Sequence, residues 1–184
     1  MPLSEPAARQ DLHRRRYDFR GYRREDGLWD IEGHMTDVKS YAFDNDYRGK
    51  IQPGEPLHDM WIRLTLDDEL VVQRAEAATE AGPFAICPDA APKLARLAGV
   101  KIGKGWRRAI NEKLGGVEGC THLREMLGAM ATVAYQSILP VLARERKRDK
   151  PGASGRPRLL DSCHAFRSDG PVVKKAWPDF YTGE

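Results

Sequence analysis

Cys120 and His122 are the residues of this chain best suited to chemistry. They stand in the run Gly119–Cys120–Thr121–His122, directly before the longest segment of helical apolar periodicity. The first turn of a helix has unpaired backbone N–H groups and a positive dipole end, and both favour a thiolate over a thiol. The pattern therefore predicts a reactive cysteine with a histidine beside it, able to act as a nucleophile or as a metal ligand.

Other polar groups of the same kind lie elsewhere in the chain. His58 and Asp59 open a predicted strand, and adjacent strand residues point to opposite faces, so one of the two is expected to enter the site. Glu32 and His34 share one face of another predicted strand and are expected at the rim of the site. The remaining candidates are Cys87, before Pro88–Asp89, and the pair Cys163–His164 near the end of the chain.

Two kinds of chemistry are open to these residues. As a metal site they would supply Cys87, Cys120, His58 or Asp59, and His122, a mixed set that suits zinc or iron. Without a metal, His58 or Asp59 would remove a proton while a thiol or a helix-start N–H stabilises the resulting anion. No paired Cys-x-x-Cys motif decides between them.

Composition limits the classes of function. The chain has 184 residues, of which 41% are hydrophobic and 31% charged, and a net charge of +3. That charge is small and evenly spread, so we expect no nucleic-acid partner. We also expect no membrane span and no signal peptide, and the three unpaired cysteines indicate the cytoplasm. The expected partner is a small-molecule substrate, and a homo-oligomer is left open.

Periodicity predicts an α+β fold in which an antiparallel sheet of about four strands is followed by three helices packed on one face. Asp26–Gly27 is a hairpin signal between strands 17–25 and 28–37. Further strands are expected at 60–66 and 70–78, and residues 42–56 are expected to form a loop. Helices are expected from Asp89 to Leu97, from Trp106 to Leu114 and from Thr121 to about Arg146. In this interpretation residues 1–15 are a disordered tail, 16–148 a single domain and 149–184 an extended C-terminal segment.

Several motifs resemble a bacterial family of unknown function, number 2889. They are the runs Asp26–His34, Pro56–Met60, Gly119–Leu123 and Cys163–Ala165. The resemblance covers most of the chain and implies no established activity. It points to the breakdown of aromatic or acyl compounds.

A second resemblance concerns architecture. Antiparallel strands, two helices and a cysteine that opens a long helix are similar to the iron–sulfur scaffold fold of the NifU N-terminal domain and SufE. That resemblance implies a cluster site in which Asp59, Cys87 and Cys120 take the family's places. This chain departs from the family pattern at two places. His58 stands where the family has its first cysteine. The family has a histidine directly before its last cysteine, whereas here Gly119 precedes Cys120 and His122 follows it.

Our first hypothesis is a small-molecule catabolic enzyme of the lyase or hydrolase type, with an enclosed apolar pocket beside Cys120. The alternative is a metal or iron–sulfur carrier that acts through protein partners and exposes the edge of its site. A third is an accessory module that has neither feature.

Overall fold

The computed structural model describes residues 3–146 and 155–184. The chain divides into two compact units, Met1–Val141 and Leu142–Glu184. Each unit is described by itself.

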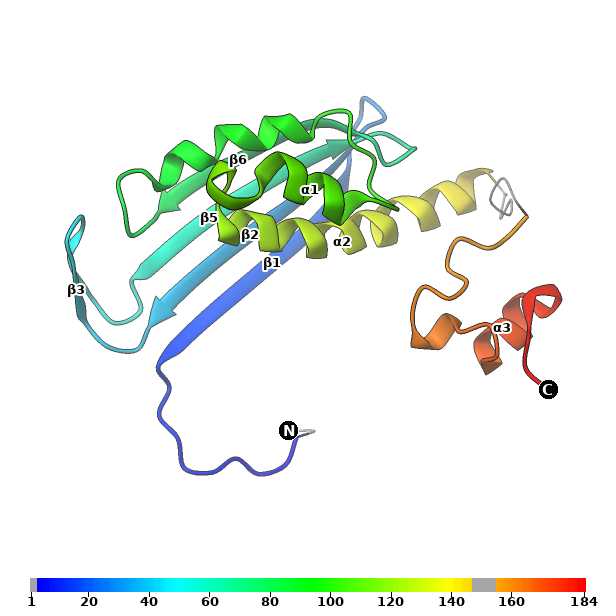
Figure 1. Ribbon diagram of the computed structural model, residues 1–184, viewed down its shortest axis with the longest axis horizontal. Coiled ribbons are helices and arrows are strands. Elements are labelled where there is room, and N and C mark those ends of the chain that lie inside the picture. The colour runs from blue at the N-terminus through cyan, green and yellow to red at the C-terminus, as the bar shows by residue number, and fades with distance from the viewer. Residues whose placement is uncertain (1–2, 147–154) are drawn as a thin grey trace. The chain divides into compact units, whose positions relative to one another are not determined.

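The first unit contains a four-stranded antiparallel sheet (Figure 1). Its strands, in spatial order, are β1 (His13–Arg23), β2 (Trp29–Lys39), β5 (Pro56–Leu66) and β6 (Val72–Ala81). The β1–β2 hairpin turns at Asp26–Gly27, where Gly27 has a φ of 84° that a residue with a side chain rarely adopts. The predicted α+β class is confirmed.

Strand alternation gives the sheet a buried face and an open face. Along β2 the odd-numbered positions from Trp29 to Asp37 are buried, and the even-numbered positions are half-buried. The even-numbered positions of β5 from His58 to Leu66 are buried in the same way. The core consists of these positions and the helices that cover them.

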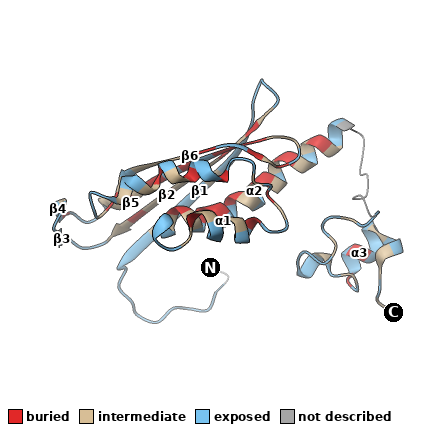
Figure 2. Ribbon diagram, turned by 45° about the horizontal axis from the view of Figure 1, so that its top comes forward, coloured by how far each residue is buried: buried red, intermediate tan, exposed pale blue. Residues whose placement is uncertain are grey.

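The helical layer covers one face of the sheet (Figures 1 and 2). It comprises η1 (Cys87–Ala90), η2 (Pro92–Leu97), α1 (Trp106–Leu114), η3 (Gly116–Glu118) and α2 (Thr121–Arg146). The indole N–H of Trp106 donates to the carbonyl of Leu127 over 3.1 Å and joins α1 to α2. The fully buried side chains of α2 are Leu123, Met126, Leu127, Met130, Ala134 and Ile138.

Two glycines of the sheet let α2 approach closely. A Cβ added at Gly21 would lie 2.7 Å from the Cβ of Ser137, and one at Gly33 would lie 3.0 Å from the Cε of Met126. Both Ser137 and Met126 belong to α2. Small residues at these positions therefore set the spacing between the helix and the strands.

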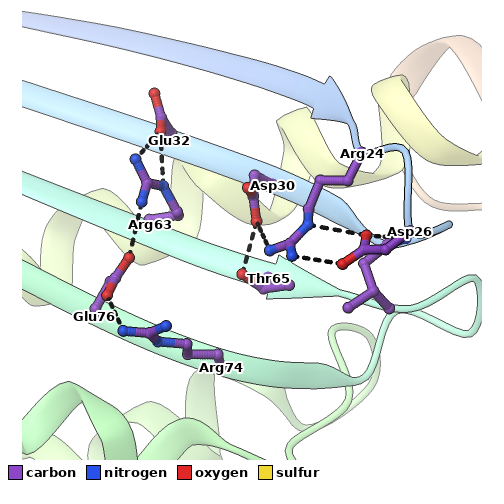
Figure 3. Close-up of polar contacts among 9 residues, drawn as sticks. Arg24, Asp26, Asp30, Glu32, Arg63, Thr65, Arg74 and Glu76 are labelled. Atoms are coloured by element: carbon purple, nitrogen blue, oxygen red, sulfur yellow. Dashed lines mark hydrogen bonds and ion pairs between the residues drawn. The ribbon is translucent and has the colours of Figure 1, made fainter.

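The open face carries ion pairs (Figure 3). Arg63 of β5 lies between Glu32 at 2.6 Å and Glu76 at 3.0 Å. Nearer the hairpin, Asp30 accepts a hydrogen bond from Thr65 over 2.7 Å. This face is therefore polar over three neighbouring strands.

Local details differ from the sequence-based expectations. β1 begins at His13, inside the segment expected to be disordered, because it pairs along its whole length with β2. The expected 42–56 loop contains a two-stranded hairpin, β3 (Phe43–Asn45) and β4 (Gly49–Ile51). The expected helix from Asp89 to Leu97 is two 3₁₀ segments, since Pro88 and Pro92 lack the N–H that an α-helix needs.

The second unit is small and partly helical. It contains the end of α2, then η4 (His164–Phe166), α3 (Pro171–Ala176) and η5 (Pro178–Phe180). Val173 is buried there, and the rings of Phe166 and Trp177 lie 5.5 Å apart. The segment after residue 149 was expected to be extended; its first residues lie outside the described part, and residues 164–180 form these short helices instead.

One helix meets the length and hydropathy criteria for a membrane span, contrary to the expectation that no segment would. Thr121–Glu145 reaches a mean hydropathy of 1.5. Core helices of soluble proteins meet the same criteria, and the apolar stripe of α2 packs on the sheet. A helix in the core of a protein and a helix in a membrane would therefore both meet these criteria.

Candidate functional site

A buried carboxylate, Asp37, organises a polar cluster on the covered face of the sheet. Asp37 ends the apolar face of β2, and only 2% of its side chain is exposed. It lies opposite His58 of β5, next to an irregularity in the register between Asp37 and Val38. Its Oδ1 lies 2.9 Å from Nδ1 of His58 and accepts the backbone N–H of the same residue over 3.1 Å.

Arg15 of β1 neutralises this carboxylate. Its guanidinium donates to Oδ2 of Asp37 through Nη2 at 2.6 Å and Nε at 3.1 Å. Burial alone would raise the pKa of Asp37, but the hydrogen bonds from Arg15 and His58 outweigh burial and hold the pKa below its ordinary value. Asp37 is therefore ionised at neutral pH.

The ionised carboxylate fixes the tautomer of His58. A carboxylate can only accept hydrogen bonds, so the proton of a neutral His58 must be on Nδ1. Nε2 then carries a free lone pair. His58 is 8% exposed, so the arrangement is a largely buried imidazole with a defined electron donor.

His122 and Cys120 of the predicted helix start lie beside His58. The rings of His58 and His122 have centroids 4.0 Å apart, with 39° between their planes. The sulfur of Cys120 lies 3.8 Å from Nδ1 of His122. The structure thus brings together three of the residues singled out from the sequence.

The environment of Cys120 favours its thiolate. Burial raises the pKa of Cys120, but hydrogen bonds from His122 and from the backbone N–H groups of Leu123 and His122 more than compensate, and the net pKa is lowered. Those N–H groups belong to the first turn of α2. This is the effect expected of a cysteine at a helix N-terminus.

Asp59, Glu32 and His34 do not join this cluster, so the expectation that Glu32 or His34 lies at its rim is wrong. Because side chains alternate along a strand, all three project from the open face. There His34 Nε2 lies 2.7 Å from Asp59 Oδ1, and its ring stacks on Trp61 at 3.7 Å. Glu32 pairs with Arg63 (Figure 3).

Cys87 makes a different contact, and Cys163 belongs to the second unit. Cys87 opens η1 and packs against Gly82, where an added Cβ would lie 2.8 Å from the Cβ of Cys87. Cys163 is exposed in the second unit. Among the described residues, one group of three or more His, Cys, Asp or Glu side chains has metal-compatible spacing: Asp37, His58 and His122.

Two hollows of the described surface lie away from the cluster. One of about 560 Å³ follows β6 and the 3₁₀ segments, and one of about 300 Å³ lies on the open face around Trp61. Neither is lined by Cys120, His58 or His122. The enclosed pocket expected beside Cys120 is not one of these two hollows.

Asp37 and Arg15 were missed by sequence reasoning. The signal for Asp37 was present, because it follows Trp29, Ile31, Gly33 and Met35 at the next position of the same strand face. A carboxylate that continues an apolar stripe indicates a buried, partnered charge. Arg15 gave no comparable signal, since it stands in the run Arg14–Arg16.

The match to a family model covers most of the first unit. The model described as "Protein of unknown function (DUF2889)" matches residues 13–136. The chain belongs to this DUF2889 family. Every residue of the cluster lies inside the matched range, whereas Cys163 and His164 lie outside it. Neither the curated proteins nor the solved structures contain a match to the chain.

Proposed function

We propose that this DUF2889 protein is a small-molecule enzyme of the hydrolase or lyase type, with aromatic or acyl compounds as its substrates. One observation carries the proposal: Asp37 holds His58 by a 2.9 Å contact at Nδ1, so that the lone pair of Nε2 is available in a largely buried site. A carboxylate–imidazole pair of this kind is suited to proton removal near neutral pH.

The neighbouring groups complement such a base. His122 and Cys120 supply a second imidazole and a thiol whose pKa is lowered. In a hydrolase the lone pair of His58 would take the proton of water or of the thiol as its oxygen or sulfur attacks an acyl carbon, and would return that proton to the alcohol or thiol that leaves as its bond to the same carbon breaks. If the thiol attacks, water would hydrolyse the acyl-thiol intermediate in a second step. In a lyase it would take a proton from carbon, and the first-turn N–H groups of α2 would stabilise the developing anion.

The open face supplies a matched control for the test. His34 and Asp59 form the same kind of pair as His58 and Asp37, on the same two strands. The full-length protein would be screened with aryl and acyl esters, acyl thioesters and hydroxyacyl compounds. We expect H58Q and D37N to lower kcat/KM by about 100-fold or more, and H34Q and D59N to leave it within about twofold. Full activity in H58Q and D37N would contradict the proposal.

The second candidate is a metal or iron–sulfur carrier that acts through partner proteins. The metal-compatible spacing of Asp37, His58 and His122 favours metal binding. An iron–sulfur cluster fits poorly, because the group with metal-compatible spacing among the described residues consists of two histidines and a carboxylate, with the single thiol of Cys120 next to His122. Anaerobic reconstitution with iron and sulfide should therefore yield a colourless, sulfide-free protein; a brown product with stoichiometric sulfide would restore the NifU/SufE comparison.

A further inference from the structure

We infer that His58, His122 and Cys120 bind one divalent ion of the zinc class, and that Asp37 and Arg15 form the outer shell of this site. The inference rests on the proposed function and changes the role of one residue: the lone pair of His58 would hold the ion, and water on the ion would replace His58 as the base. Zinc-bound water has a pKa of about 7 and would supply the base that the reaction needs.

Asp37 belongs to the outer shell because its acceptor positions are already used. Oδ1 receives the backbone N–H of His58 and faces its Nδ1, and Oδ2 receives two N–H groups of Arg15. A direct bond from Asp37 to an ion would break one of these contacts. A carboxylate that orients a histidine through one nitrogen, while the other nitrogen faces the metal, is the usual outer-shell arrangement.

Two spacings support the inner ligand set. Around a tetrahedral zinc ion, with bonds of about 2.1 Å to nitrogen and 2.3 Å to sulfur, a nitrogen and a sulfur ligand lie about 3.6 Å apart. The sulfur of Cys120 and Nδ1 of His122 are 3.8 Å apart. One ligand atom each from Asp37, His58 and His122 lies within 4.8 Å of the others, so the two rings are close enough to share one ion. Cys120 lies outside that group and is next to His122, so the His58 and Cys120 side chains must rotate toward each other to complete the inner set.

The ligand types and their exposure agree with this assignment. Two imidazoles and a thiolate form a borderline-soft set that suits zinc better than magnesium or calcium. Cys120 and His122 are half-buried, so an ion can reach them from solvent. Three protein ligands would leave the fourth position open, as in catalytic zinc sites.

Cobalt(II) titration of the metal-free, full-length protein tests the site without any substrate. We expect saturable binding of one Co²⁺ per chain, with a near-ultraviolet thiolate-to-cobalt charge-transfer band, and displacement of the cobalt by Zn²⁺. C120S should lose the band. H58Q and H122Q should weaken binding by at least about tenfold, and D37N by about 10- to 100-fold.

Matched controls come from the same chain. C87S and H34Q should bind cobalt like the unaltered protein, and thermal melting monitors the folding of every variant. Absence of saturable binding, or a charge-transfer band that survives in C120S, would overturn the site. If the site were overturned while H58Q still lost hydrolase or lyase activity, the proposed function would stand. Cobalt binding as expected, without any enzymatic activity, would support the metal site and favour the carrier.

Discussion

At the scale of single residues, Asp37 determines what the neighbouring side chains can do. It lies in the covered layer with three nitrogen-bearing partners: Arg15, His58 and, at 3.5 Å, His13. Its charge is balanced by Arg15, so its remaining effect is to orient His58. The reactive groups were identified from the sequence, whereas Asp37, which orients His58, was missed although its place on the apolar strand face was a signal.

The lowered pKa of Cys120 predicts fast alkylation. Removing the hydrogen bond from His122 in H122Q should raise the pKa of Cys120, leave less thiolate at pH 7 and slow its reaction with iodoacetamide several-fold. Mass spectrometry of the alkylated peptides measures the rate as a function of pH. H34Q is the control, because His34 lies on the open face of the sheet and its loss should leave the rate at Cys120 unchanged. A rate–pH profile of Cys120 that is identical in H122Q would contradict this account.

The lowered pKa of Asp37 predicts how stability depends on pH. Its pKa lies below the unfolded value of about 3.9, so the ionised carboxylate contributes fully above that pH, and the contribution disappears as pH falls through the folded-state pKa. At pH 7, D37N should lower the free energy of unfolding by about 2–4 kcal/mol, because Arg15 and His58 lose their partner.

Urea denaturation at several pH values measures this effect. Between pH 5 and pH 3 the unaltered protein should lose stability more steeply than D37N. The half-buried Asp59 serves as the control, and D59N should cost about 1 kcal/mol or less. Equal costs for D37N and D59N would show that burial does not distinguish the two pairs.

Part of the candidate site could be predicted from the sequence, because some of its features are local and others depend on contacts across the sheet. A helix start can be identified locally, so Cys120 and His122 were found together. The pairing of Asp37 with His58 depends on the register between β2 and β5, including its irregularity after Asp37. Register depends on contacts across the sheet, and a single chain segment does not reveal it.

At the scale of elements, alternation and helical periodicity predicted most of the sheet and the long helix. Strands β2 and β5, the hairpin turn and α2 follow those patterns directly. The 3₁₀ segments η1 and η2 do not, because two prolines and the packing against β6 override the apolar spacing. The interface of the sheet with α2 depends on glycines whose role appears only in three dimensions.

The closest approach of α2 to the sheet can be tested at Gly21. In G21A the new methyl group would lie 2.7 Å from the Cβ of Ser137, so the helix must shift, at a cost of about 1–3 kcal/mol. G128A is the matched control on α2, where an added Cβ meets nothing within 4 Å, and it should stabilise the protein by about 0.5–1 kcal/mol. Chemical denaturation measures both values, and a neutral G21A would contradict the close packing.

At the scale of the whole molecule, the first unit contains the sheet, the helical layer and the whole Asp37 cluster. The family match ends at residue 136, within α2 and near the end of this unit. Apart from Leu142 and Val173, the buried apolar side chains of the described residues belong to the first unit as well. This unit therefore has the core needed to fold independently.

A truncation after Arg146 tests that independence. The shortened chain should unfold cooperatively within a few degrees of the full-length melting temperature. It should also retain the iodoacetamide reactivity of Cys120. Circular dichroism and alkylation provide the two measurements. Loss of the cooperative transition would show that the second unit, Leu142–Glu184, is required for the fold.

The two imidazole–carboxylate pairs have a consequence of their own. On the covered face Asp37 accepts from Nδ1 of His58, whereas on the open face Asp59 lies 2.7 Å from Nε2 of His34. In their neutral forms the two rings are therefore opposite tautomers, one on each side of the sheet. Nitrogen-15 chemical shifts distinguish the two tautomers. A single spectrum would therefore contain the signals of His58 and, as a reference, those of His34 in the opposite tautomer.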